Sequence, residues 1–275
     1  MSRKFRLHAA AASVALALGL ASGQAAAVPV ALELALVIDV SGSVDASEYN
    51  LQMDGYGAAF KSATVQSAIE SFSASGGIAV GIYFFATNAL QGVSWTQLAN
   101  GAQSVAFGTV LEGLARPGTG TASPGGGSLG TSTNVAEGMD LARAGILANG
   151  FEGARLVMDV SGDGKQNVTR DGTSSCTTEG VICNTATDNA RDAAAAAGIV
   201  VNGLAIIDDF ADLATWYGAH VKTATGFVQS ATFNTFAAAI EGKIGKEIAD
   251  VPEPTTIALL GASLLGFGFA RRRKV

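Results

Sequence analysis

A short segment at the end of an apolar run carries three oxygen-bearing side chains at alternate positions. The run ALVIDV begins at Ala35, and Asp39, Ser41 and Ser43 follow one another with a spacing of two. Aspartate, glycine and serine commonly form turns after strands, so the segment could be an ordinary loop. A carboxylate and two hydroxyls in one short loop could equally be ligands of a hard divalent cation. The rest of the sequence has to distinguish a turn from a metal site.

Two further positions add oxygen ligands of the same kind. Thr133 lies at the start of an expected helix, and Asp163 follows the apolar run ARLVMDV in the segment SGDG. Asp159 is an alternative acidic ligand, but Asp163 is preferred because Asp159 lies inside the run rather than at its end. Two carboxylates and three hydroxyls suit octahedral Mg²⁺ and would leave a position for water or an incoming carboxylate. Another divalent cation, such as Mn²⁺ or Ca²⁺, is an alternative.

Apolar runs that alternate with helical patterns predict the fold that would bring these residues together. Nearly continuous apolar runs, typical of strands covered on both faces, occupy residues 33–40, 78–86, 154–160 and 199–207. Helices are expected at about 46–61, 133–148, 187–197 and 233–248, with a last short strand at 227–228. This order predicts an α/β fold with a doubly wound, mostly parallel sheet and helices on both faces. Asp39 and Asp163 then share the carboxyl edge of the sheet, where such folds bind ligands.

Three other segments of the body have a weaker pattern. Residues 90–95 and 104–107 are expected to be short or edge strands joined by the polar turn Asn100-Gly101. The glycine-rich segment 116–132 is typical of a surface connector.

Both ends of the chain have the composition of processing segments. Residues 1–27 combine basic residues, an apolar stretch and a small-residue ending, which predicts a secretory signal peptide. Pro252-Glu253-Pro254 is followed by the apolar segment 255–270 and a basic end. A helix of this segment would be ~24 Å long, which is short for a ~30 Å hydrocarbon core but tolerable in an adjusted bilayer. Residues 251–275 are therefore predicted to form a tail with a short transmembrane segment.

The order of these features in the tail resembles the PEP-CTERM sorting signal of Gram-negative bacteria. The resemblance implies export through the inner membrane, transient anchoring, cleavage by an exosortase-type enzyme, and delivery to the cell surface or extracellular matrix. A plain C-terminal membrane anchor is the competing interpretation.

Charge and cysteine content restrict the class of the protein between these ends. Residues 28–250 contain 10 Lys/Arg and 22 Asp/Glu, a net charge of −12. This charge argues against nucleic acid and anionic lipid surfaces as partners. Cys176 and Cys183 are expected to form a disulfide because the predicted compartment is oxidising.

Taken together, the five oxygen ligands resemble the metal-ion-dependent adhesion site (MIDAS) of von Willebrand factor type A (VWA) domains. Asp39, Ser41 and Ser43 match the Asp-x-Ser-x-Ser element of that family. Thr133 matches its loop threonine, and Asp163 matches its strand-end aspartate. The resemblance spans about residues 30–250 and implies a Rossmann-like fold and an uncharacterised bacterial subgroup.

Three functions remain open on these grounds. The first is a non-enzymatic, adhesion-type module that binds a protein or an acidic extracellular polymer through the metal. The second is a structural matrix protein in which the metal only stabilises the fold. The third, a metal-assisted hydrolase, is the weakest, because the site lacks a candidate general base beyond its own ligands.

Overall fold

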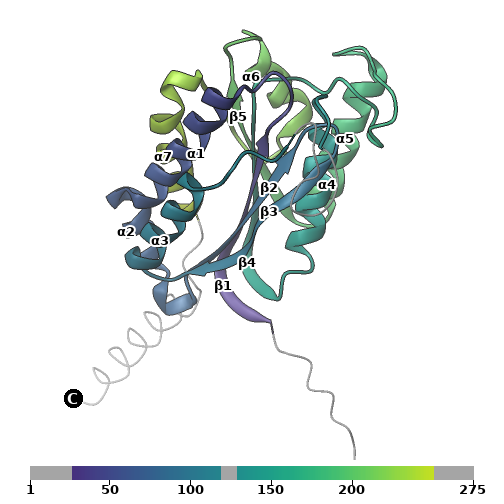
Figure 1. Ribbon diagram of the computed structural model, residues 1–275. Coiled ribbons are helices and arrows are strands. Elements are labelled where there is room, and N and C mark those ends of the chain that lie inside the picture. The colour runs from purple at the N-terminus through teal and green to yellow at the C-terminus, as the bar shows by residue number, and fades with distance from the viewer. Residues whose placement is uncertain (1–26, 119–128, 251–275) are drawn as a thin grey trace, which may run out of the picture.

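The computed structural model describes residues 27–118 and 129–250 (Figure 1). The expected signal peptide, up to residue 26, and the expected tail with its apolar segment 255–270 lie outside the described residues. Within the described parts, the structure contains no helix that is long and apolar enough to cross a membrane.

A single six-stranded sheet forms the centre of the described region. Its strands are ordered β3-β2-β1-β4-β5-β6, and every neighbouring pair is parallel except β2 and β3. The first three strands are β1 (Val28–Asp39), β2 (Ile78–Phe85) and β3 (Ala89–Leu98). The other three are β4 (Phe151–Gly162), β5 (Ile199–Ile206) and β6 (Val228–Ala231). The mostly parallel sheet predicted from the sequence is confirmed.

Helices cover both faces of this sheet, as Figure 1 shows. One face packs against α1 (Ala46–Lys61), α2 (Ala63–Ser71), α3 (Gly101–Glu112) and α7 (Phe236–Ala249). The other packs against α4 (Val135–Ile146), α5 (Val181–Ala196), α6 (Leu213–Trp216) and the π-helical turn η2 (Tyr217–Val221). Two short 3₁₀ turns complete the described helices, η1 (Ser73–Ser75) and η3 (Phe233–Thr235).

The central strand β1 explains why both faces need cover. Its side chains alternate between the two faces, so that Leu34 and Leu36 enter the core under α1 and α7. Ala35 and Val37 enter the core under α4 and α5. All four side chains are fully buried. The nearly continuous apolar run predicted for this strand is the pattern of a parallel strand covered on both faces.

The prediction of a strand at residues 104–107 was wrong. These residues lie in α3, whose start is capped by the Asn100 side chain, which accepts a hydrogen bond from the backbone of Gln103. The buried residues of α3 follow a helical spacing that begins at Ser104 and continues through Phe107 to Leu111. The Phe107 ring packs edge-to-face on Phe60 of α1. The cap and the contact with α1 therefore both stabilise this helix.

A buried cluster of charged side chains lies between β4 and α7. Lys243 Nζ lies 2.5 Å from Asp159 Oδ1 and 2.6 Å from Glu247 Oε1, and all three side chains are fully buried. The amide of Asn202 donates a 2.7 Å hydrogen bond to the same Glu247 oxygen. Asp159, the alternative metal ligand, thus faces Lys243. Burial and the neighbouring Asp159 charge raise the pKa of Glu247 to about 7.

Candidate metal site

The loop between β1 and α1 positions the first three candidate ligands. β1 ends at Asp39, and the Asp39 Oδ1 atom accepts a 2.8 Å hydrogen bond from the backbone N–H of Ser41. The loop closes on a capping box at the start of α1, in which Asp45 and Glu48 bond each other's backbone N–H groups. The strand end and the helix cap together restrict the path of the loop and the directions of its side chains.

Tertiary structure joins the other two candidates to this loop. The hydroxyl of Ser43 donates a 2.8 Å hydrogen bond to Oδ1 of Asp163, directly after β4. Thr133, just before α4, donates from Oγ1 to Ser41 Oγ over 3.2 Å, and the Ser41 and Ser43 hydroxyls are also 3.2 Å apart. All five predicted side chains therefore lie in one hydrogen-bonded cluster, which we name the Asp39 cluster.

The carboxylates of the Asp39 cluster are electrostatically unfavourable without a cation. The Asp39 side chain is fully buried, and its Oδ2 atom has no hydrogen-bond partner among the described residues. Burial, followed by the charge of Asp163, raises the pKa of Asp39 to about 8. Burial likewise raises the pKa of Asp163 to about 6, although the bond from Ser43 opposes it. A divalent cation would offset both the burial cost and the mutual repulsion, so the residues present fit such an ion.

The composition of the cluster restricts how it could hold a metal. Within residues 27–118 and 129–250, no group of three His, Cys, Asp or Glu side chains is arranged to hold a metal ion. Hydroxyl oxygens would have to complete the coordination, and three of them lie beside the two carboxylates. Serine and threonine oxygens favour a hard cation such as Mg²⁺ over a softer one.

Arg116 supports the loop and was not predicted from the sequence. Its guanidinium donates to three backbone carbonyls of the loop, those of Val40, Ser41 and Val44, at 3.1, 3.0 and 2.5 Å. Its positive charge also lowers the pKa of Asp39, by less than burial raises it. The sequence placed Arg116 at the start of a glycine-rich connector, and no local pattern there indicates a contact with a loop more than seventy residues away.

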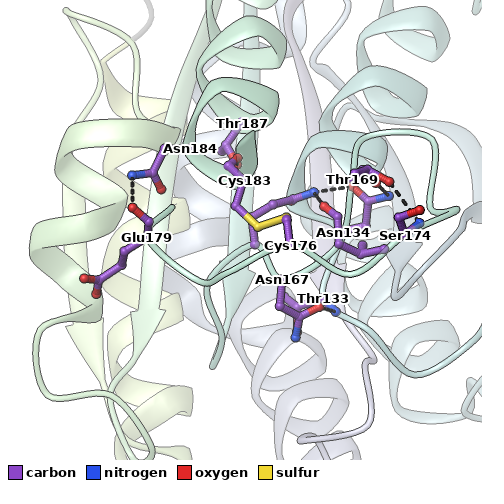
Figure 2. Close-up of a disulfide and its surroundings, with 12 residues drawn as sticks. Thr133, Asn134, Asn167, Thr169, Ser174, Cys176, Glu179, Cys183, Asn184 and Thr187 are labelled. Atoms are coloured by element: carbon purple, nitrogen blue, oxygen red, sulfur yellow. Dashed lines mark hydrogen bonds between the residues drawn. A yellow bond between two sulfur atoms is a disulfide. The ribbon is translucent and has the colours of Figure 1, made fainter. Parts of the chain in front are cut away.

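A disulfide supports Thr133 through a single asparagine (Figure 2). The side chain of Asn167 accepts a 2.9 Å bond from the Thr133 backbone N–H, and the Asn167 N–H donates back to the Thr133 carbonyl at 3.1 Å. The N–H of Cys176 donates to the Asn167 carbonyl at 3.1 Å. Cys176 is joined to Cys183 at the start of α5 by a disulfide with a Cα–Cα separation of 5.8 Å. The covalent link therefore connects α5 to the backbone that holds Thr133.

Removal of this disulfide is expected to destabilise the protein by about 2–3 kcal/mol, from the loop-closure entropy of a short loop. The change is Cys176→Ser with Cys183→Ser, and the measurement is urea unfolding. Cation affinity should also fall, because Asn167 is less firmly held beside Thr133. Unchanged unfolding free energy would contradict the structural role of the link.

Lys165, two residues after Asp163, forms a second set of contacts that the sequence did not reveal. Its buried ammonium pairs with Glu179 and lies 2.7 Å from Asp212 Oδ2, and it lies over the Phe210 ring. Glu179 has a φ of +64°, a left-handed value that no other non-glycine residue of the described chain adopts. Glu179 pairs with Lys165 and lies in the loop closed by the disulfide between Cys176 and Cys183.

The raised pKa of Asp39 predicts how stability depends on pH. The folded state keeps a proton that the unfolded state loses above the ordinary pKa of 3.8, so the metal-free protein loses stability as pH rises from that value to about 8. Mg²⁺ should reduce this loss, because it stabilises the charged carboxylate. Melting temperatures in EDTA and in Mg²⁺ across this pH range test the prediction. Parallel curves in the two buffers would contradict it.

Sequence comparisons identify a family and a motif. The chain matches the family described as "Protein of unknown function (DUF1194)" over residues 29–252. It matches the PEP-CTERM protein-sorting motif over residues 250–274. No curated protein matches the sequence.

Solved structures with the same fold include two pilus proteins. The vWF domain of the type V pili tip protein Mfa5 from Porphyromonas gingivalis is 12% identical, with a TM-score of 0.53, and the match covers 83% of this chain and 98% of that chain. The PilB minor pilin from Streptococcus sanguinis is 15% identical, with a TM-score of 0.55, covering 82% of this chain and 64% of that chain.

A third similar structure contains a metal. The proximal thread matrix protein 1 from the mussel byssus, with a zinc-occupied MIDAS motif, is 14% identical, with a TM-score of 0.50. The match covers 82% of this chain and 48% of that chain, so this chain spans about half the length of the mussel protein. At these identities the likeness establishes the fold alone, which is that of VWA domains.

Proposed function

Since this chain belongs to the DUF1194 family, whose function is unknown, we propose its function from the Asp39 cluster: a metal-dependent, adhesion-type binding module. In this proposal Asp39, Ser41, Ser43, Thr133 and Asp163 hold a divalent cation. When bound, the cation supplies an open coordination position for a carboxylate of a protein or of an acidic extracellular polymer. The module holds its partner and does not transform it.

One observation carries this proposal. Two repelling carboxylates and three hydroxyls from three separate segments meet at one edge of the sheet, with the buried Asp39 Oδ2 left unpaired. A turn would need only the local bonds of residues 39–45. It would not explain why Thr133 and Asp163, far away in the sequence, complete the same cluster. Mg²⁺ is our first choice of ion, and the zinc in the mussel protein's MIDAS motif supports divalent binding by this fold.

The sorting motif supports an extracellular location for the module. The match at residues 250–274 favours export, transient membrane anchoring and processing by an exosortase-type enzyme, with delivery to the surface of a Gram-negative cell or its matrix. The disulfide between Cys176 and Cys183 suits an oxidising compartment. We propose residues 1–27 as signal peptide, 28–250 as VWA domain and 251–275 as sorting signal.

A structural matrix protein remains the second candidate, in which the cation only stabilises the fold. The raised pKa values of Asp39 and Asp163 favour cation-linked stability under either function. The single His of the described region is His220, whose Nδ1 lies 3.0 Å from Asp188 Oδ1 and whose ring is tilted against the Trp216 ring. It is therefore engaged outside the Asp39 cluster, which supports the choice of binding over hydrolysis.

Retention of an acidic polymer tests the binding proposal directly. The full-length mature protein is applied to immobilised polygalacturonate and to neutral dextran, in Mg²⁺ and in EDTA. Retention on the acidic matrix alone, lost in EDTA and in Asp163→Asn, is the expected result. An Asp-containing peptide array read under the same conditions covers the protein-partner case.

Two outcomes would decide against the binding proposal. Binding that persists both in EDTA and in Asp163→Asn would show that the cluster is not the binding site. Cation-dependent melting together with no retention on any carboxylate probe would favour the matrix-protein alternative.

A further inference from the structure

Tyr217 contributes a buried hydroxyl that the fold alone does not explain. The side chain is fully buried, and its OH group has no hydrogen-bond partner within the described residues. An unpaired buried hydroxyl costs about 1–3 kcal/mol, and phenylalanine would fill the same space without that cost. Tyr217 begins η2, a π-helical turn, and such turns often occur at functional sites.

Two glycines on neighbouring strands make room for this tyrosine. A Cβ atom at Gly203 of β5 would lie 2.7 Å from Cδ1 of the Tyr217 ring. A Cβ atom at Gly162 of β4 would lie 2.9 Å from the Tyr217 hydroxyl. Real Cβ atoms do not approach other atoms this closely, so a side chain at either position would displace the tyrosine. The ring thus lies against β5 and its hydroxyl reaches the end of β4.

The unpaired oxygen of Asp39 lies close to the same Cβ position of Gly162. A Cβ atom there would lie 2.7 Å from Asp39 Oδ2, as well as 2.9 Å from the Tyr217 hydroxyl. Two buried polar atoms without partners therefore lie within 3 Å of the same point beside Gly162. One bridging water, or a shift that brings the two atoms within direct hydrogen-bond distance, would connect them.

We propose that Tyr217 is a positioning residue of the Asp39 cluster, whose hydroxyl donates to Asp39 Oδ2, directly or through one water, and so orients this carboxylate toward the cation. This inference rests on the proposed metal site and adds to it a residue from the β5–β6 connection. Gly162 and Gly203 are part of this arrangement, because a Cβ atom at either position would collide with Tyr217.

The direction of donation follows from the chemistry of the two groups. A phenol carries its proton at neutral pH, and an ionised carboxylate can only accept hydrogen bonds. The Tyr217 hydroxyl is therefore the donor and Asp39 Oδ2 the acceptor. Outer partners of this kind orient metal ligands, and their loss typically lowers metal affinity 10–100-fold.

The test removes only the hydroxyl, with Tyr217→Phe in the full-length mature protein. The matched control is Tyr83→Phe, because the Tyr83 hydroxyl also lies in the core on this face but accepts a 2.8 Å hydrogen bond from Trp95 Nε1. Affinity for Mn²⁺ is measured by calorimetry, the bound ion by electron paramagnetic resonance, and metal-free stability by thermal unfolding. For Tyr217→Phe we expect about tenfold weaker Mn²⁺ binding and an altered resonance spectrum.

The metal-free melting temperature separates positioning from packing. Tyr217→Phe should change it no more than Tyr83→Phe does, because each variant removes one buried hydroxyl together with its hydrogen bond. Wild-type Mn²⁺ affinity in this variant would overturn the inference, and so would a loss of affinity matched by an equal loss in Tyr83→Phe. If Asp39→Asn abolishes Mn²⁺ binding while Tyr217→Phe does not change it, only this inference fails. If the wild-type protein does not bind Mn²⁺, the proposed function fails first.

Discussion

Asp39→Asn is expected to weaken Mg²⁺ and Mn²⁺ binding by at least about 100-fold, because cation affinity depends on the number of charged ligands. The amide has nearly the same shape, and its oxygen can still accept the bond from the Ser41 N–H. The same change should stabilise the metal-free protein near pH 8, because it removes a buried charge that Asp163 repels. Calorimetric titration and thermal unfolding in EDTA measure the two effects.

The opposite signs of these two effects make the result diagnostic. The matched control is Asp209→Asn, an exposed carboxylate whose charge raises the pKa of Asp163 but which is not part of the cluster. It should change cation affinity only slightly. Equal losses of affinity in both variants would show general attraction by the acidic surface, and would contradict a site built on Asp39.

Lys243→Met is expected to destabilise the fold by about 3–5 kcal/mol, because it leaves two buried carboxylates without their cation. Asp159 and Glu247 both pair with the Lys243 ammonium, and all three side chains are fully buried. The loss should grow as pH rises, since the raised pKa of Glu247 allows it to be neutral at low pH. Urea unfolding at acidic and alkaline pH measures this dependence.

Lys246→Met is the matched control for this variant, one helical turn away on α7. Lys246 is exposed, and its ammonium lies 3.9 Å from the centre of the Phe227 ring. A loss of at most about 1 kcal/mol is expected for such an exposed cation–π contact. Similar losses in the two variants would mean that the buried cluster contributes no more than a surface contact.

Hydrophobic patterning was sufficient to predict the class of fold. The continuous apolar runs that became β1, β2, β4 and β5 are typical of strands covered on both faces, and their alternation with helices predicted the mostly parallel sheet. The same reasoning failed at residues 104–107. The Asn100 cap and the spacing of Ser104, Phe107 and Leu111 indicate a helix. The strand prediction followed instead from the short apolar segment that contains Val105 and Phe107.

The contacts around the Asp39 cluster show the limit of prediction from local sequence. Arg116, Asn167 and Lys165 act through contacts that cross 75, 34 and 47 positions of the chain. No periodicity reports such contacts, because they depend on where loops meet in space. The position of the Tyr217 hydroxyl near Asp39 is even harder to predict from sequence, because it depends on two glycines in different strands.

The sequence by itself determined the five oxygen-bearing residues of the cluster and the sheet edge at which they meet. It could do so because the carboxyl ends of parallel strands meet at one edge, whatever lies between them. Only the tertiary structure decided that Asp39 is buried with one oxygen unpaired, that Asp159 belongs to Lys243, and that Tyr217 reaches the cluster. Burial and the pairing of charges depend on packing between distant segments, which the order of residues does not display.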